Sequence, residues 1–335
     1  MTPAGTTSSG IPDGAPRFPA GEPPRIGISA CLLGEEVRFD GGHKRDPFLT
    51  DTLAPYVEWV QVCPEVEVGM GTPRETLRLV REGETGVRMV TTRSGIDHTA
   101  SMQRWSRMRV EELARENLSG YVLKKDSPSC GMERVKVYGG AVSQRNGRGL
   151  FAEALLARFP HLPVEEEGRL SDPRLRENFI ERVFAYQRLR TFFGGRWTTG
   201  GLVAFHTAHK MSLLSHSTVA YNELGRLVAS AAKLPRATVR EDYESGFMGT
   251  MACLATTRRH TNVLMHMAGH LKTLLDADSK HELLACIDEY RKGLVPLVVP
   301  LTLIRHYVRV HKLAYLAGQT YLEPHPRELM LRNRV

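Results

Sequence analysis

The 335-residue sequence lacks several features that define common classes of protein. No run approaches the roughly 18 apolar residues that a membrane-spanning helix needs. The N-terminus has neither the basic region nor the apolar region of a secretory signal. The five cysteines are an odd number and do not indicate a disulfide framework. No internal repeat is evident. We therefore expect a soluble, cytoplasmic protein of about two domains, preceded by a flexible Pro/Gly/Ser-rich leader over residues 1–24.

Positive charge is unevenly distributed along the chain. Residues 161–335 contain 24 Lys and Arg against 17 Asp and Glu, whereas residues 1–160 contain 21 against 20. Arginine outnumbers lysine 35 to 10, and a planar guanidinium suits bidentate contacts with phosphate. This composition favours a polyanionic partner, although a bias in genomic base composition would also enrich arginine.

Short apolar segments in the first half predict β-strands over Arg25–Ala30, Val57–Val62 and Tyr121–Lys124. A helix is expected between the last two, over residues 99–118. Its apolar side would carry Met102, Trp105, Met108 and Leu113. Strands separated by a helix of this length indicate an α/β domain with a parallel, Rossmann-like sheet over residues 25–160.

The second half has a different pattern, which predicts an all-α helical domain over residues 172–335. Asp172 and Pro173 are typical of a helix start. Further helices are expected at about 201–217, 219–232, 240–254, 260–275 and 280–293, with Leu264, Met267, Leu271 and Leu274 along one face of the fourth. Pro160, Pro163 and the acidic run Glu165–Glu167 suggest an exposed junction within residues 159–172.

Three cysteines follow the three predicted strands: Cys31, Cys63 and Cys130. The carboxyl ends of parallel strands form the edge at which α/β sheets bind ligands. Three thiolates suit a metal centre with one open position better than a closed, four-ligand zinc site. The alternative is that all three are small core residues. Cys253 and Cys286 lie in predicted helices, where packing is the simpler interpretation.

Several motifs resemble those of known families. In the first half, SACLLG with VRFDGG, VCPEVEVGMGTPR and LKKDSPSCG resemble the motifs of the thiouracil desulfidase (TudS-type) family, in the same order and over about residues 25–155. In the second half, FHTAHKMSLLSHS, HTNVLMHMAGHLK, EYRKGLVPLVVPLTLIRHYV and QTYLEPHPRELMLRN resemble the YbgA-like domain. A fusion of this layout is similar to desulfidases that act on 4-thiouridine in tRNA.

The resemblance implies a non-redox desulfidase with a 4Fe–4S cluster that has one iron open to the substrate's sulfur. It implies that Cys31, Cys63 and Cys130 hold the cluster, and that Glu65 and Ser127 are catalytic. Arg74 and Asp40 match further motif positions and are candidates for substrate binding. An iron that is bound by sulfide and thiolate suits a soft thiocarbonyl sulfur.

Arginines on the predicted helix over 99–118 are candidates for RNA contact. Arg104 and Arg107 share one side of it with Arg115, and Arg78, Arg81, Arg88 and Arg93 add charge nearby in the sequence. Positive charge that follows the backbone is typical of RNA recognition. The alternative is a solvated helix face that pairs with Glu111, Glu112 and Glu116.

The histidines of the second half do not form a recognised metal motif. His206, His209 and His216 share one predicted helix, and His260, His266 and His270 share another. We favour packing or RNA contacts for them, and we assign them no catalytic role. Three hypotheses for the whole chain follow: a tRNA 4-thiouridine desulfidase, a desulfidase of free thiouracil or thiouridine in base salvage, and a non-catalytic, metal-stabilised RNA-binding module.

Overall fold

The structure is a computed structural model, and it describes residues 22–83, 86–139 and 142–334. Most of the expected leader, residues 1–21, lies outside these ranges. The chain separates into two compact units, one of residues 20–187 and one that contains residues 188–335. We call them the N-terminal unit and the C-terminal unit. The division falls inside helix α4 (Pro173–Gly194), later in the chain than the junction expected over 159–172.

A four-stranded parallel sheet forms the centre of the N-terminal unit. Its strands are β1 (Arg25–Ser29), β2 (Glu58–Val62), β5 (Leu118–Leu123) and β8 (Val164–Glu166), in the spatial order β2-β1-β5-β8. Every pair in this sheet is parallel. The prediction of a parallel α/β fold is confirmed, and the three expected strands are present. Every residue of β5 is buried, as is typical of a strand covered on both faces.

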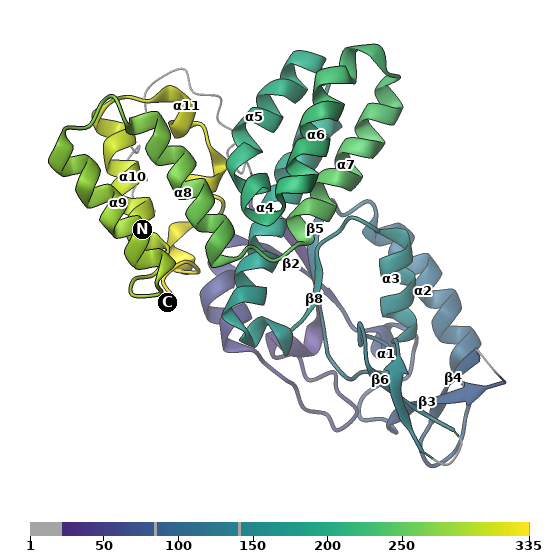
Figure 1. Cartoon of the computed structure of the whole chain (residues 1–335). Helices are drawn as coiled ribbons and strands as arrows, with labels where there is room; N and C mark the ends of the chain where they lie inside the picture. Colours follow the sequence, from purple (N-terminus) through teal and green to yellow (C-terminus); the bar gives the residue numbers. More distant parts are fainter. Residues whose placement is uncertain (1–21, 84–85, 140–141, 335) are drawn as a thin grey trace, which may run out of the picture. The chain divides into compact units, whose positions relative to one another are not determined.

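Helices α2 (Thr99–Leu113) and α3 (Leu150–Arg158) run side by side in this unit (Figure 1). Val110 and Leu113 of α2 share a hydrophobic core with Phe151 and Leu155 of α3 and with strand β5. The expectation that Met108 lies on the apolar side of α2 is wrong, because its side chain is 60% exposed. The buried side of the helix carries Met102, Ser106, Val110 and Leu113.

A second four-stranded sheet lies in the same unit, and the sequence analysis did not predict it. Its strands are β3 (Leu77–Glu82), β4 (Gly86–Thr91), β6 (Val135–Tyr138) and β7 (Gln144–Gly147), in the order β4-β3-β6-β7. Strand β3 is antiparallel to β4 and parallel to β6. Leu79, Met89 and Val137 form a buried face that packs with Met102 of α2.

The acidic run Glu165–Glu167 is buried, so the expectation that it marks an exposed junction is wrong. Each carboxylate has a partner. Glu165 pairs with Arg169 at 2.6 Å, Glu166 accepts a hydrogen bond from the Met132 amide at 2.8 Å, and Glu167 pairs with Lys124. Burial of a charged group is tolerated where it is paired in this way.

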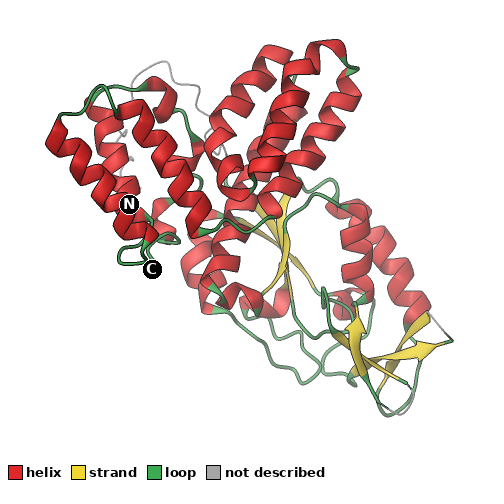
Figure 2. Ribbon diagram, viewed as in Figure 1, coloured by secondary structure: helices red, strands yellow, loops and turns green. Residues whose placement is uncertain are grey.

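The C-terminal unit is helical, as predicted (Figure 2). Helix α4 begins in the N-terminal unit and ends in the C-terminal one. Asp172 caps its start by accepting hydrogen bonds from the amides of Arg174 and Leu175. The helices that follow are α5 (Thr199–His216), α6 (Thr218–Ser230), α7 (Arg236–Ala252), α8 (Thr257–Leu271), α9 (Ala277–Arg291), α10 (Val298–Val310) and α11 (Ala314–Ala317). The last two were not predicted.

The core of the C-terminal unit contains one face of α8, with Leu264, Met267 and Leu271 fully buried. Leu274, which the periodicity places on the same face, lies beyond the end of α8 and is 41% exposed. Within the described ranges, none of the helices is both long enough and apolar enough to span a bilayer.

Candidate active site

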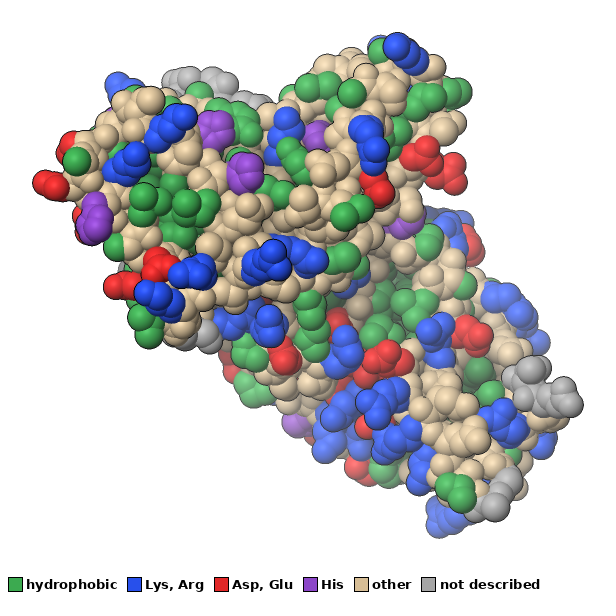
Figure 3. Space-filling model, viewed as in Figure 1, with side chains coloured by type: hydrophobic (Ala, Val, Ile, Leu, Met, Phe, Trp, Pro, Cys, Tyr) green, Lys and Arg blue, Asp and Glu red, His purple; other side chains and the backbone are tan. Residues whose placement is uncertain are grey.

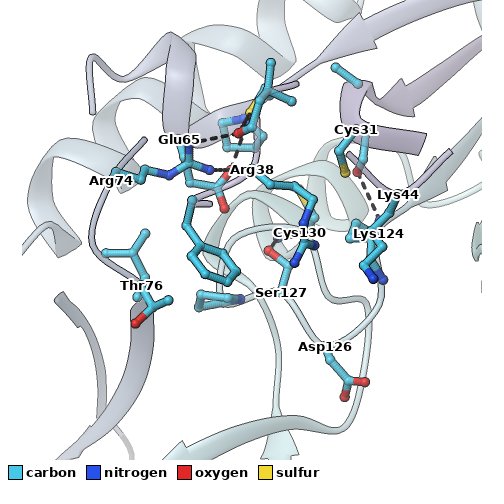
Figure 4. Close-up of a pocket in the computed structure, with 18 of the residues that line it drawn as sticks. Cys31, Arg38, Lys44, Glu65, Arg74, Thr76, Lys124, Asp126, Ser127 and Cys130 are labelled. Carbon is cyan, nitrogen blue, oxygen red and sulfur yellow. Dashed lines mark hydrogen bonds and ion pairs between the residues drawn. The ribbon is translucent and has the colours of Figure 1, made fainter. Parts of the chain in front are cut away.

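The three cysteines that follow predicted strands line one cavity of about 380 Å³ in the N-terminal unit. Cys31 lies in the turn after β1, Cys63 follows β2 directly, and Cys130 lies in the loop after β5. Figure 4 shows Cys31 and Cys130 on separate loops around this cavity. Because β2, β1 and β5 are neighbouring parallel strands, their carboxyl ends bring together residues that are far apart in the sequence.

The thiols occupy a desolvated environment. Burial raises the pKa of Cys31 to about 11, partly offset by the positive charge of Lys124. The pKa of Cys63 is also raised to about 11, first by burial and then by the neighbouring Glu65 carboxylate. Burial also raises the pKa of Cys130 well above its usual value. Thiols in such surroundings become thiolates where a metal supplies the compensating positive charge.

A chain of hydrogen bonds joins the two predicted catalytic residues through a third side chain. The Ser129 hydroxyl donates to Glu65 Oε1 at 2.5 Å and lies 2.9 Å from the Ser127 hydroxyl. Ser127 Oγ also accepts hydrogen bonds from the amides of Ser129 and Cys130, at 3.2 and 3.1 Å. Glu65 and Ser127 come from different loops, and the fully buried Ser129 fixes their relative positions.

The loop that carries Ser127–Cys130 is anchored by the start of α3. The amides of Leu150 and Phe151 donate to the carbonyls of Pro128 and Ser129, at 3.1 and 3.0 Å. Gly149 permits this close approach, because a Cβ atom there would lie 2.4 Å from the Ser129 carbonyl group. The serine pair therefore sits on a backbone that the helix holds in place.

Arg74 holds together two segments that line the cavity. Its guanidinium donates to the Val37 and Gly71 carbonyls at 2.8 and 3.0 Å, and lies 4.0 Å from Glu65 Oε2. Its amide donates to the Phe39 carbonyl at 2.9 Å. Asp40 does not line the cavity. Its carboxylate accepts a hydrogen bond from the Gly42 amide, which lowers its pKa, and lies 3.5 Å from Arg38.

Cationic side chains and one aromatic ring complete the lining. Besides Arg74, the cations are Arg38, Lys44, Lys124 and Lys125. The Arg38 guanidinium lies over the Phe39 ring, 5.2 Å from its centroid. The acids in the lining are Glu65, Glu75 and Asp126. With the thiols protonated, cations outnumber acids, and the cavity suits a ligand that carries negative charge or a centre held by thiolates.

The donor set of the cavity fits an iron–sulfur cluster. Among the described residues, no three His, Cys, Asp or Glu side chains converge as ligands of a single ion would. A cluster distributes its thiolate ligands over separate irons and needs thiols that surround a shared space. The cavity supplies three such thiols, whereas Cys253 and Cys286 belong to the other unit. Three thiols leave one position of a four-iron cluster open.

Arg104 and Arg107 are exposed on α2 and do not line the cavity. Their role in substrate binding stays a prediction. In the C-terminal unit, four of the predicted histidines are buried among aromatic and polar partners: His206, His209, His216 and His260. For example, His206 Nδ1 lies 3.2 Å from the Tyr243 hydroxyl, and His260 Nδ1 lies 2.8 Å from the Tyr321 hydroxyl. His266 and His270 are exposed.

Sequence reasoning missed Ser129 and the lysines of the cavity. Ser129 directly precedes Cys130, which was predicted to hold the cluster. The S-P-S sequence is typical of a turn, and a residue that only forms a turn was not selected as functional. Lys124 follows β5, and its Nζ pairs with Glu167. Lys124 could have been selected from its position at the end of a strand, the signal that identified Cys31 and Cys63.

Comparison with known proteins agrees with the division into two parts. Residues 26–167 match a family model described as 2-thiouracil desulfurase, and residues 210–326 match one described as a protein of unknown function (DUF1722). The chain is 34% identical over 164 residues to the uncharacterized protein YbgA of Escherichia coli (strain K12), which covers 48% of this chain and 95% of YbgA.

Two further similarities were found. The chain is 30% identical over 149 residues to the uncharacterized protein YbbK of Bacillus subtilis (strain 168), which covers 43% of this chain and 97% of YbbK. Among solved structures, it is similar to a 4Fe–4S-dependent thiouracil desulfidase, TudS (DUF523Vcz), at 35% identity over 44% of this chain and 94% of that chain, with a TM-score of 0.36. The chain belongs to the 2-thiouracil desulfurase family and carries a DUF1722 region after its desulfurase region.

Proposed function

We propose that this protein is a non-redox desulfidase that converts 4-thiouridine in tRNA to uridine and releases sulfide. The observation that carries the proposal is the convergence of three thiols, Glu65 and Ser127 on one cavity of about 380 Å³. Family membership supports removal of sulfur from a thiolated pyrimidine. The excess of arginine and the cations of the cavity support a polyanionic substrate.

We infer that Cys31, Cys63 and Cys130 hold a 4Fe–4S cluster, the cofactor that the similar TudS protein depends on. When bound, the cluster supplies a Lewis acid with one position open to the soft thiocarbonyl sulfur. No other cysteine is available in the described part of the N-terminal unit. The raised pKa values of the thiols fit this role, because a bound metal centre removes the cost of holding buried thiolates.

The side chains of the cavity are placed to manage protons. Glu65 accepts a hydrogen bond from Ser129 and can take a proton from a water that adds to the ring carbon. Two backbone amides occupy Ser127 Oγ as an acceptor, so its own proton is free to be donated to the pyrimidine or to Ser129. The Arg74 guanidinium lies 4.0 Å from the other carboxylate oxygen of Glu65.

The overall reaction requires only water. Its oxygen replaces the sulfur on the ring carbon, and its two protons leave with sulfide, so that no electron transfer is needed. The same chemistry would serve a desulfidase of free thiouracil or thiouridine in base salvage. A non-catalytic, metal-stabilised module that binds RNA is the other alternative, and the short Ser129–Glu65 hydrogen bond beside two thiols favours the enzyme over it.

The test compares three substrates with anaerobically reconstituted protein: tRNA that contains 4-thiouridine, the free nucleoside and the free base. We expect release of sulfide and loss of the thiocarbonyl absorbance, fastest with tRNA. Faster turnover of the free base would favour salvage. If protein with a full cluster binds tRNA but turns over none of the three substrates, the enzymatic proposal is wrong and the binding module is favoured.

A further inference from the structure

The second sheet has an outer face that combines cations with an exposed aromatic ring. Strand β6 alternates strictly, with Val135 and Val137 buried and Lys136 and Tyr138 exposed. In the register of the sheet, Tyr138 lies beside Val80 of β3, and Val80 lies opposite Arg88 of β4. The other face is the buried one that packs with α2. The outer face therefore exposes Lys136 and Tyr138 to solvent, whereas α2 covers the hydrophobic face of the same sheet.

Two cations lie against the Tyr138 ring. The Lys136 ammonium is 5.0 Å from the ring centroid, and the Arg78 guanidinium is 5.7 Å from it. Neither cation has a carboxylate within ion-pair distance in the described part of the chain. In contrast, Arg88 pairs with Glu82 and Asp97, and Arg145 pairs with Asp126. The positive charge around Tyr138 is thus left uncompensated on the protein itself, and an anionic partner would complement it.

The outer face is continuous with the cavity. Leu77 and Asp126 line the cavity. Leu79 pairs with Val137, so Tyr138 lies three residues, or about 10 Å, further along the sheet than the position beside Leu77. The Leu77 side chain packs on the buried face of the sheet, and the outer face therefore meets the cavity rim through β7. The Asp126–Arg145 ion pair, at 3.0 Å, joins the cavity rim to β7, where Arg145 lies opposite Lys136. Figure 3 shows Lys and Arg side chains gathered on one face of this unit.

We propose that this outer face binds the RNA strand that flanks the target nucleotide. Tyr138 stacks on a neighbouring unpaired base, and Arg78 and Lys136 bind phosphates beside it. Sheets that bind single-stranded RNA use this combination of an aromatic ring with cations. The inference rests on the proposed action on RNA and deepens it, because it assigns recognition of the strand outside the cavity to residues of the desulfurase region itself.

The experiment measures kcat/KM on thiolated tRNA and on the free nucleoside, together with equilibrium binding of unmodified tRNA by fluorescence anisotropy. Tyr138→Ala is expected to lower kcat/KM on thiolated tRNA about tenfold relative to kcat/KM on the free nucleoside. It should weaken tRNA binding by a similar factor. Tyr138→Phe keeps the ring and should retain at least half of the wild-type affinity. Lys136→Ala and Arg78→Ala should each weaken binding and reduce its dependence on salt.

Arg104 and Arg107 are the competing candidates for RNA contact, and they lie on α2, which packs against the opposite face of the same sheet. Their replacement by alanine removes the same charge as Arg78→Ala and should weaken tRNA binding less. An equal or larger effect of the α2 variants would overturn the inference, as would unchanged tRNA binding by Tyr138→Ala. Turnover of the nucleoside by wild-type protein that neither binds nor desulfurises tRNA would instead refute the proposed substrate, and the inference with it.

Discussion

Both units bury polar and titratable side chains, but they do so in different ways. In the N-terminal unit, thiols, serines and carboxylates from several segments line a shared cavity. In the C-terminal unit, each buried histidine is enclosed by its own neighbours; His209, for example, stacks on Phe205 with the ring centroids 4.2 Å apart. Burial of polar groups alone therefore does not indicate a reactive site. The useful indicator is that groups from separate strand ends share one open space.

The largest expected effect is the loss of iron on removing a thiol of the cavity. Cys31→Ala, Cys63→Ala and Cys130→Ala should each abolish stable cluster binding, because a cluster left with two protein ligands is exposed to exchange and loss. Anaerobic reconstitution, with iron and sulfide quantitation and a visible absorption spectrum, measures this. About four irons per chain are expected for the wild type.

The two cysteines of the C-terminal unit are matched controls for these variants. Cys253 lies at the end of α7, and Cys286 lies within α9. Cys253→Ala and Cys286→Ala should retain the iron and the spectrum of the wild type. Loss of iron in either control, or one zinc per chain in the wild type, would contradict the inference that the thiols of the N-terminal unit hold an iron–sulfur cluster and those of the C-terminal unit do not.

The next effect concerns turnover with the cluster intact. Glu65→Ala is expected to lower kcat by about 10²–10⁴, the usual contribution of a general acid or base. Ser129→Ala should lower it about ten- to a hundredfold, because it removes a hydrogen bond to a charged carboxylate, typically about 1.5–3 kcal/mol. Single-turnover desulfurisation of thiouridine measures both, and iron content verifies that the cluster is retained.

Ser106 on α2 is the matched control for Ser129, since both serines are fully buried in the same unit. Its hydroxyl has no hydrogen-bond partner among the residues that the structure describes, and Ser106→Ala should leave kcat unchanged. If Ser129→Ala leaves kcat unchanged, as Ser106→Ala should, the hydrogen-bonded pair Ser127 and Ser129 is structural. The polar groups of the cavity would then only pack, as the buried histidines of the C-terminal unit do.

Local periodicity was sufficient to predict much of the fold. The strands that became β1, β2 and β5 and the helices from α4 to α9 were predicted, because their apolar patterns and caps are strong. The second sheet was missed although β3 and β6 alternate apolar and polar residues, a pattern that predicts strands. Only β7, whose sequence is QRNG, has no apolar residue that could have indicated it. The Glu165–Glu167 run misled because its burial depends on Arg169 and Lys124, partners that composition does not reveal.

The cysteines of the candidate site could be predicted, because in a parallel sheet the carboxyl ends of the strands lie at the same edge. Cysteines at successive strand ends must approach one another in a parallel sheet, and Cys31, Cys63 and Cys130 do so. The role of Ser129 required knowledge of a contact between residues 64 positions apart. No pattern in one sequence encodes such a contact, because it depends on how α1 (Pro64–Glu67) and the Ser127–Cys130 loop are oriented in space.

The smallest expected effect is a pH dependence of stability in the C-terminal unit. Burial, and next the charge of Lys210, lower the pKa of His206 from 6.5 to about 4. Between these pH values the unfolded chain binds a proton that the folded chain excludes. The contribution of His206 to stability is therefore complete above pH 6.5 and is lost as the pH falls towards 4, by about 3 kcal/mol at most.

Urea denaturation at pH 7 and pH 5 of the wild type and of His206→Gln measures this effect. The variant removes the titrating ring but keeps a polar group that can face Tyr243, so its loss of stability on acidification should be smaller. Other groups titrate equally in both proteins, and the difference between them isolates His206. The exposed His266 is the control, and His266→Gln should lose as much stability as the wild type. If all three proteins lose the same free energy of unfolding between pH 7 and pH 5, His206 is not held in its neutral form. The buried histidines of the C-terminal unit would then be more accessible to protons than their packing indicates.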